Sequence, residues 1–452
     1  MARLAAGRVP PRASHGFRLE WDHLRMASFI GFFLMIWFFP NPNAVSFRED
    51  PGAGREGTLI VQLLWFGSLA FALLNVQDRW SDVRQQFDLS LILLMGWCAA
   101  SVPIAILPDV SMRRYIFTLV ALLATILCVA SPRRMVTILW LFLAIILAET
   151  VTKYVFVFAL PGLGRHGYLG AEPQLNGLWK GQFAHKNIAG PVCVFELFIL
   201  YAARGRVPAA WLMLLAIPQV IFLVMSGSKT SLALLVAVFC LTTAILRTRS
   251  LFVILGIASG AVFAINALTI LSTMSDFFHE LARVVIGDAS FTGRTDVWAM
   301  LVRYIGEHPF MGAGMLSFWQ IGAASPAATD GNTWVSVASY GHQGYLDTAA
   351  TIGLPGLALA LLFILVRPVL DLTTIPRNDT RLLGMFVSFW LFGLLHNGTE
   401  SNMLGRADNA WLFLIIGVAG IRRCRVESAK RAFVPEPATR RLPRPPSLAR
   451  RA

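Results

Sequence analysis

Gly293-Arg294-Thr295-Asp296-Val297-Trp298 and Gly341-His342-Gln343-Gly344-Tyr345-Leu346-Asp347 lie in the one long interval after the N-terminal segment that does not have the composition of a membrane span. This interval runs from Asp276 to Asp347 and also contains Gly312-Ala313-Gly314. Apolar runs precede and follow it. We therefore interpret the rest of the chain as a hydrophobic scaffold that holds this segment at one face of a bilayer. We expect any chemistry at that boundary between water and lipid.

The composition indicates a polytopic membrane protein. The chain has 452 residues, of which 56% are hydrophobic and only 14% are charged, whereas a soluble domain usually carries about 25% charged residues. The net charge is +14, and much of the excess lies in tails and short loops. That placement fits the positive-inside rule better than a nucleic-acid partner, so we expect no nucleic acid to bind. The five cysteines form no disulfide framework, and no Cys/His spacing predicts a metal site.

The apolar runs are long enough to be membrane spans, since a transmembrane helix needs about 20 mostly apolar residues. The sequence therefore predicts an all-α polytopic membrane protein with about 12 transmembrane helices and a long outer loop that contains amphipathic helices. The predicted spans are residues 24–40, 58–76, 89–107, 114–130, 135–159, 188–203, 208–226, 229–246, 250–274, 344–366, 381–396 and 408–421.

These spans divide the chain into five parts. They are a basic N-terminal segment at 1–23, nine spans within 24–275, the large loop at 276–343, three spans within 344–421 and a basic tail at 422–452. We expect the tail to be disordered, because it is rich in Pro and Arg and poor in large apolar residues, and to be attracted to anionic lipid headgroups.

The orientation follows from the arginines of the short loops, which mark cytoplasmic loops. Every loop assigned to the inside is basic, both termini are then cytoplasmic, and the large loop lies outside. Arg113 and Arg114, on the outer side near the fourth span, are the clearest exception to this rule.

The large loop has two segments with the periodicity of amphipathic helices. Phe277, Leu281 and Val284 recur at helical spacing in the first. The second follows a possible N-cap at Thr292 and ends before Pro309. We expect both helices to lie on the membrane surface or over the spans.

Basic and imidazole side chains gather at the outer face against the positive-inside trend. Cations in this position indicate an anionic partner, for which a lipid phosphate is the simplest choice. His185 and Lys186 are either ligands or interfacial anchors. The candidate residues, with the polar neighbours included, are His185, Lys186, Asn187, Lys229, Arg294, His342 and Asp347.

Each of these residues also has a structural interpretation. Lys229 can extend to lipid headgroups, Arg294 can pair locally with Asp296, and His342 can be a satisfied hydrogen-bonding group. Asp347 can pair with a basic residue or fix the tautomer of His342.

Glu149 and Glu196 lie inside predicted spans. Ionisable residues within a membrane are functional candidates, but the sequence does not identify a partner for either carboxylate.

Four motifs together resemble the O-antigen ligase family, which includes exopolysaccharide and O-antigen polymerases. The first two are Phe183-Ala184-His185-Lys186-Asn187-Ile188-Ala189-Gly190 and Met225-Ser226-Gly227-Ser228-Lys229-Thr230-Ser231. The third is the Gly293–Trp298 motif, leading to Pro309-Phe310-Met311-Gly312-Ala313-Gly314, and the fourth is the Gly341–Asp347 motif, leading to Gly353-Leu354-Pro355-Gly356. The likeness covers roughly residues 161–366.

The resemblance implies a glycosyltransferase that uses no metal or cofactor and works at the periplasmic face of the bacterial inner membrane. Its donor would be a glycan on a polyprenyl diphosphate, and its acceptor another glycan or lipid A core. His342 and Arg294 would be catalytic, as base and as cation at the diphosphate. The residues that bind the diphosphate or the glycan would be Lys229, Lys186, His185, Asn187 and Asp347.

Two departures from the family pattern bear on the substrate. Lys229 stands where the ligases often carry Arg, and Gln343 follows His342 where they often carry Asn. The His185-Lys186-Asn187 run looks more like the exopolysaccharide polymerases, so we favour that subclass. The alternative function is a polytopic transporter or flippase for lipid-linked oligosaccharide, which would also have about twelve spans.

Overall fold

The computed structural model describes most of the chain, and its described residues are helical without β-strands. The described ranges are 21–38, 59–167, 173–286, 294–330, 333–336, 338–377, 380–405 and 409–433. The helices are α1 (Trp21–Phe38), α2 (Leu59–Asn75), α3 (Trp80–Val83), α4 (Leu89–Ser101), α5 (Pro108–Ala130), α6 (Met135–Ala159), α7 (Pro161–Gly164), α8 (Lys186–Ala202), α9 (Ala209–Met225), α10 (Lys229–Leu246), α11 (Leu251–Thr269), α12 (Asp276–Ile286), α13 (Arg294–Glu307), α14 (Thr333–Ser336), α15 (Gly344–Leu361), α16 (Arg367–Thr374), α17 (Thr380–His396) and α18 (Asn409–Phe433). The expected all-α class is confirmed.

Each predicted span coincides with a helix of this series, although the number of membrane crossings stays a prediction. By length and composition alone, five helical stretches among the described residues can cross a membrane. They are Pro108–Ala130, Met135–Ala159, Lys229–Leu246, Leu251–Thr273 and Gly344–Thr374. Other predicted spans correspond to shorter apolar helices, among them Ala209–Met225 and Thr380–His396.

The centre of the molecule is the antiparallel pair α17 and α18. Glycines allow their backbones to approach closely, because a Cβ on Gly417 would lie 2.6 Å from the Trp390 nitrogen. Against this pair α8 contributes Phe195, whose ring stacks on Phe413 with centroids 4.1 Å apart. Phe389 meets the same ring edge-on at 5.2 Å. The aromatic side chains thus fix α8 and its N-terminus relative to α17 and α18.

Helix α15 is broken at Gly353, and two sequence motifs meet at the break. Gly353 has φ 74°, and a Cβ there would lie 1.9 Å from the Phe310 oxygen. The Leu354 nitrogen donates to the Pro309 oxygen at 2.7 Å. The Ala313 nitrogen donates to the Ala350 oxygen at 2.8 Å. The backbone groups freed by the break are therefore satisfied by the loop that follows α13.

Arg114, an exception to the positive-inside rule, has a structural role. Its Nη1 donates to the carbonyls of Leu316 and Trp319 at 2.6 and 2.9 Å, and its Nη2 donates to that of Gln320 at 2.9 Å. Leu316 and Gln320 both have positive φ, at 51° and 57°. The guanidinium thus satisfies carbonyls of a strained turn, which explains a cation on this side.

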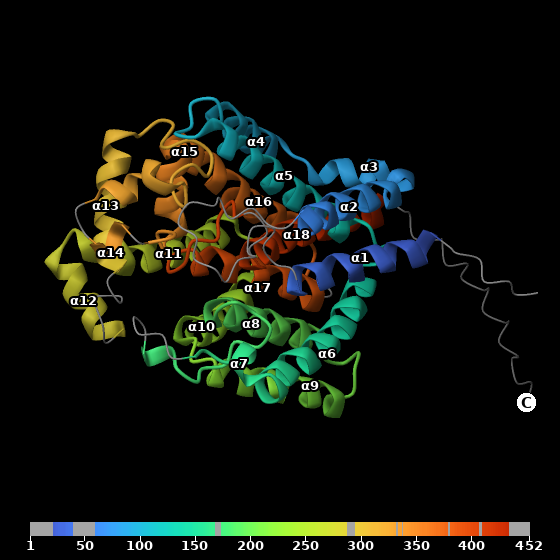
Figure 1. Ribbon diagram of the computed structural model, residues 1–452. Helices are drawn as coiled ribbons and strands as arrows, with labels where there is room; N and C mark the ends of the chain where they lie inside the picture. Colours follow the sequence, from blue (N-terminus) through green and yellow to red (C-terminus); the bar gives the residue numbers. More distant parts are fainter. Residues whose placement is uncertain are drawn as a thin grey trace, which may run out of the picture.

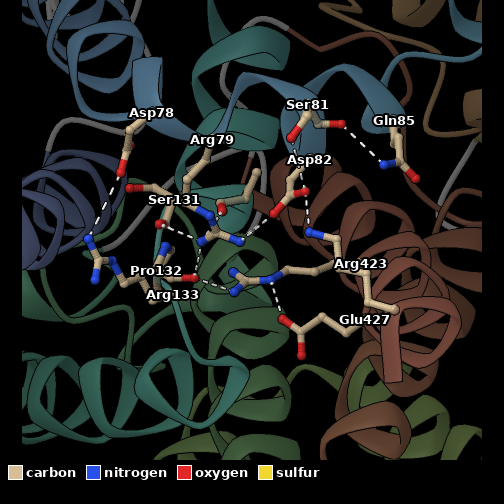
Figure 2. A network of polar contacts seen from close by, with 12 residues as sticks. Asp78, Arg79, Ser81, Asp82, Gln85, Ser131, Pro132, Arg133, Arg423 and Glu427 are labelled. Atoms are coloured by element: carbon tan, nitrogen blue, oxygen red, sulfur yellow. Dashed lines mark hydrogen bonds and ion pairs between the residues drawn. The ribbon is translucent and has the colours of Figure 1, made fainter. Parts of the chain in front are cut away.

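Helix α18 extends to Phe433, so the first part of the expected disordered tail is helical. Arg423 donates to the carbonyls of Val129, in the last turn of α5, and of Pro132, just beyond it. Arg79 also donates to the Pro132 carbonyl, at 2.8 Å (Figure 2). Arg423 of α18 and Arg79 thus supply donors to carbonyls at the end of α5, where the helix leaves such groups unpaired. Residues 434–452 of the expected tail lie outside the described residues.

The large loop and this arginine cluster belong to opposite ends of the molecule. Helices α12, α13 and α14 gather at one end in Figure 1, and α3 lies at the other. Trp298 and Leu301 of α13 are buried. On α12, by contrast, Phe277 and Val284 are 70% and 74% exposed. The predicted N-cap Thr292 and Gly293 lie outside the described residues.

Candidate functional site

Glu400 joins residues from three distant parts of the sequence. Its Oε1 accepts from the Nδ2 of Asn187 at 2.9 Å and pairs with the Nη2 of Arg294 at 3.1 Å. Its Oε2 lies 3.1 Å from the Nδ1 of His342. The starts of α8 and α13, the loop before α15 and the loop after α17 therefore converge on one carboxylate.

The backbone around His342 is held tightly, and this explains the flanking glycines. A Cβ on Gly341 would lie 2.4 Å from Asp347 Oδ1, and one on Gly344 would lie 2.2 Å from Asn397 Oδ1. Trp298 Nε1 donates to the Gly341 carbonyl at 2.8 Å. His342 itself has φ 52°, a strained conformation for a residue with a side chain. Its orientation is thus set by packing, as catalytic side chains require.

The charge of Glu400 is stabilised by its partners. Burial alone would raise the pKa of this carboxyl, but the charge of Arg294 and the hydrogen bond from His342 bring the pKa to about 2. The exposed fractions of the His342 and Arg294 side chains are 26% and 22%, against 11% for Glu400. The carboxylate therefore lies behind an imidazole and a guanidinium that a substrate can reach.

Two neutral imidazoles cap the start of α8. His185 Nδ1 accepts from the Asn187 nitrogen at 3.1 Å, and His166 Nε2 accepts from the Lys186 nitrogen at 3.2 Å. Burial lowers the pKa of His185 to about 4, and its neighbour His166 contributes. Burial likewise lowers the pKa of His166 to about 4, with the charges of Lys180 and Lys186 adding to the effect. Both rings are neutral at pH 7, the form in which a ring nitrogen can accept.

The start of α8 also links Glu400 to the turn that carries Lys229. Lys186 Nζ donates to the Gly227 carbonyl at 3.1 Å, and the next residue, Asn187, contacts Glu400. A Cβ on Gly190 would lie 2.6 Å from the Ser228 side chain, so α8 and this turn are in close contact. Lys229 is exposed, and its Nζ has no hydrogen bond or ion pair within the described residues.

Asp347 does not contact His342 through a hydrogen bond. Its Oδ1 accepts from Trp319 Nε1 at 2.8 Å, and its Oδ2 accepts from the Gly341 nitrogen at 2.9 Å. Glu400, and not Asp347, is therefore the carboxylate that contacts the His342 ring and can fix its tautomer. Asp347 instead anchors the loop that carries His342.

A cavity of about 380 Å³ adjoins this cluster. Of the predicted residues, its wall includes His185, Asn187 and Asp347, together with Glu400. The structure thus brings Arg294, His342 and Asn187 together on Glu400 and puts His185 and Asp347 along the same cavity. Lys186 connects this group to the turn of Lys229.

Sequence reasoning missed Glu400 and also the partner of the two membrane carboxylates. The available signal for Glu400 was the polar run His396-Asn397-Gly398-Thr399-Glu400-Ser401-Asn402 between two apolar spans.

The partner of the two membrane carboxylates is Lys153. Its Nζ lies 2.7 Å from Glu149 Oε2 and 2.8 Å from Glu196 Oε2, and all three side chains are 0% exposed. Lys153 stands four residues after Glu149, at helical spacing, inside a span.

Comparison with known proteins supports the resemblance. The family model described as O-antigen ligase matches residues 208–361, which include Lys229, Arg294, His342 and Asp347. A search of curated proteins found no match. The start of α8 and Glu400 lie outside the matched residues. Residues 208–361 therefore match the O-antigen ligase family model, and the resemblance of the chain to this family is confirmed.

Proposed function

We propose that this protein transfers a glycan from a polyprenyl diphosphate to a sugar hydroxyl at the periplasmic face of the inner membrane. The O-antigen ligase domain supports a membrane glycan ligase or polymerase role. The observation that carries the chemistry is the convergence of His342 and Arg294 on Glu400.

His342 acts as the general base. A carboxylate at Nδ1 orients the imidazole and stabilises the positive charge that develops when Nε2 takes a proton. Glu400 lies 3.1 Å from Nδ1, so Nε2 is the nitrogen left for the acceptor hydroxyl. This arrangement makes a sugar hydroxyl a better nucleophile at the moment of attack.

Arg294 and Lys229 stabilise the departing diphosphate. The Arg294 guanidinium has five N–H donors. One donates to the Thr399 carbonyl at 2.7 Å, and one donates to Glu400. The remaining donors suit phosphate oxygens. Lys229, exposed at the start of α10, adds a second positive charge, and Lys186 lies between the two groups.

The reaction is a single displacement. The acceptor oxygen forms a bond to the anomeric carbon of the donor, and the bond from that carbon to the phosphate oxygen breaks. The electron pair leaves on the diphosphate, and the hydroxyl proton passes to His342 Nε2. Attack from the side opposite the leaving group inverts the anomeric configuration.

Membranes that contain the protein and its lipid-linked donor test this function. Wild-type protein should release polyprenyl diphosphate and form a glycosidic bond, and His342→Ala should lose this activity at equal membrane abundance. Retention of transfer by the variant would remove the base assignment. Movement of donor across vesicles without bond formation would favour the flippase instead.

Within this function we favour the polymerase over the ligase, because the His185-Lys186-Asn187 run resembles the exopolysaccharide polymerases. Deletion of the gene should then remove long surface polymer. Loss of only the lipid-A-linked form, with accumulation of carrier-linked chains, would identify a ligase instead.

A further inference from the structure

The wall of the 380 Å³ cavity includes residues that have no part in the chemistry proposed above. Asn409, the first residue of α18, lies there beside Ala410. Asn409 is 2% exposed, and neither its Oδ1 nor its Nδ2 has a hydrogen-bond partner among the described residues. A buried side-chain amide without partners destabilises a fold, so its presence on a cavity wall indicates a ligand that supplies them.

The charged groups on the cavity wall are already engaged. Arg114 donates to three backbone carbonyls, and Asp347 accepts from Trp319 and Gly341. Glu400 is shared among Arg294, His342 and Asn187. The polar atoms of these groups are thus used on protein partners, whereas the Asn409 amide is unsatisfied among the described residues and offers a donor and an acceptor to an uncharged polar ligand.

The rest of the wall suits a ring with apolar faces and polar edges. Phe318, Trp319 and Tyr340 also line the cavity. The volume lies within the range of about 300–1,000 Å³ that is usual for ligand pockets, in which a few polar groups fix the orientation. An aromatic wall together with one buried amide offers contacts to the C–H face and to the hydroxyl groups of a sugar.

We infer that this cavity binds the ring of an uncharged sugar and that Asn409 exchanges hydrogen bonds with its hydroxyl groups. The inference rests on the proposed function, which requires sugars on both substrates. The ring belongs either to the acceptor or to the first sugar of the donor glycan. The diphosphate lies outside this cavity, toward Lys229.

Direct binding tests the inference without relying on transfer. The probes are the methyl glycosides of glucose, galactose, mannose and N-acetylglucosamine, measured by saturation-transfer NMR on full-length protein in nanodiscs. At least one probe should bind the wild type. Asn409→Leu should weaken that binding at least about tenfold without lowering the thermal stability, because it removes an unpaired amide. Ala410→Leu, which adds volume at the neighbouring residue of the cavity wall, should have the same effect.

Asn75→Leu is the matched control. Asn75 is also buried, at 1% exposure, but its Nδ2 donates to the Leu24 carbonyl at 3.4 Å, and it does not line the cavity. This variant should lose stability and keep glycoside binding. If no probe binds the wild type, or if Asn409→Leu and Ala410→Leu bind as the wild type does, the inference is overturned.

Transfer assays then identify the source of the ring and separate this inference from the proposed function. A raised KM for acceptor alone in Asn409→Leu assigns the cavity to the acceptor, and a raised KM for donor alone assigns it to the donor. Glycoside binding that depends on Asn409, in a protein that forms no glycosidic bond, would remove the proposed function and leave the sugar site.

Discussion

Among single residues, Glu400 has the contacts that determine how the candidate site works. One carboxylate contacts an imidazole, a guanidinium and an amide that come from different motifs. Its negative charge also limits how strongly Arg294 repels a protonated His342. The residue that organises the site is therefore an acid, although the motifs that predicted the site are basic.

Replacing Glu400 with Gln should lower kcat on the order of 10²-fold, because an amide neither stabilises the imidazolium nor fixes its tautomer. Initial transfer rates at equal protein abundance measure this effect. Glu280→Gln is the control, since Glu280 is exposed on α12 and pairs there with Arg283. Equal kcat in wild type and Glu400→Gln would show that His342 is not the base oriented by this carboxylate.

The histidine caps of α8 predict a dependence of stability on pH. Because the pKa of His185 and His166 is about 4 in the fold, below the usual 6.5, the unfolded chain binds protons first as the pH falls. Stability should therefore decrease between pH 6.5 and 4. Glu400, with a pKa near 2, contributes stability that is lost only below about pH 4.5.

Thermal unfolding at pH 7 and pH 5 measures this loss. His185→Asn keeps a capping oxygen but removes the titrating ring, so the difference in stability between the two pH values should shrink by on the order of 1 kcal/mol. An unchanged difference would mean that His185 does not titrate in this window.

At the scale of helices, α6, α8 and α9 are joined by a buried polar cluster. Lys153 contacts Glu149 and Glu196, and it also donates to Gln219 Oε1 at 2.6 Å. Glu149 in turn accepts from Gln182 at 3.2 Å, in the loop that leads to His185. The cluster thus connects the membrane-embedded helices to the start of α8.

Lys153→Met should destabilise the protein by about 3–5 kcal/mol, because it leaves two carboxylates buried without their cation. Membrane abundance and the unfolding temperature report this loss. Glu196→Gln in the Lys153→Met background should recover part of it. If Lys153→Met is as stable as the wild type, the cluster does not hold these helices together.

The end of α18 supports a second prediction at this scale. Arg423→Leu leaves the carbonyl of Val129 without its donor and removes one of the two donors to the Pro132 carbonyl, so we expect a loss of about 1–3 kcal/mol in unfolding free energy. Lys430→Leu is the control, because Lys430 is 54% exposed and pairs with Asp82. Equal stability of the two variants would show that α18 does not need this contact.

For the whole molecule, α12–α14 and α3 lie at opposite ends in Figure 1, and the predicted orientation assigns the first end to the periplasm. Thr329 and Ser81 are exposed residues near these two ends. In a background without the native cysteines, a cysteine at Thr329 should react with an impermeant maleimide in spheroplasts. A cysteine at Ser81 should react only after lysis. The reverse pattern would invert the orientation and contradict a periplasmic site.

The sequence by itself determined the all-α class, the positions of the apolar helices and the motifs of the family. Those features are local, since hydropathy and helical periodicity are properties of short stretches. Arg294 and His342 were also predicted, because basic and imidazole side chains gather at the outer face against the positive-inside trend, and Asn187 was predicted from the family motif that contains it.

Only the tertiary structure decided how these residues are partnered. Asn187 contacts Glu400 across 213 positions of the chain, and Arg294 does so across 106. The break at Gly353 likewise depends on Pro309 and Phe310, which approach it in space and contact its backbone. Hydrogen bonds and ion pairs depend on distances of a few ångströms between atoms, and such distances between remote residues arise from the packing of whole helices.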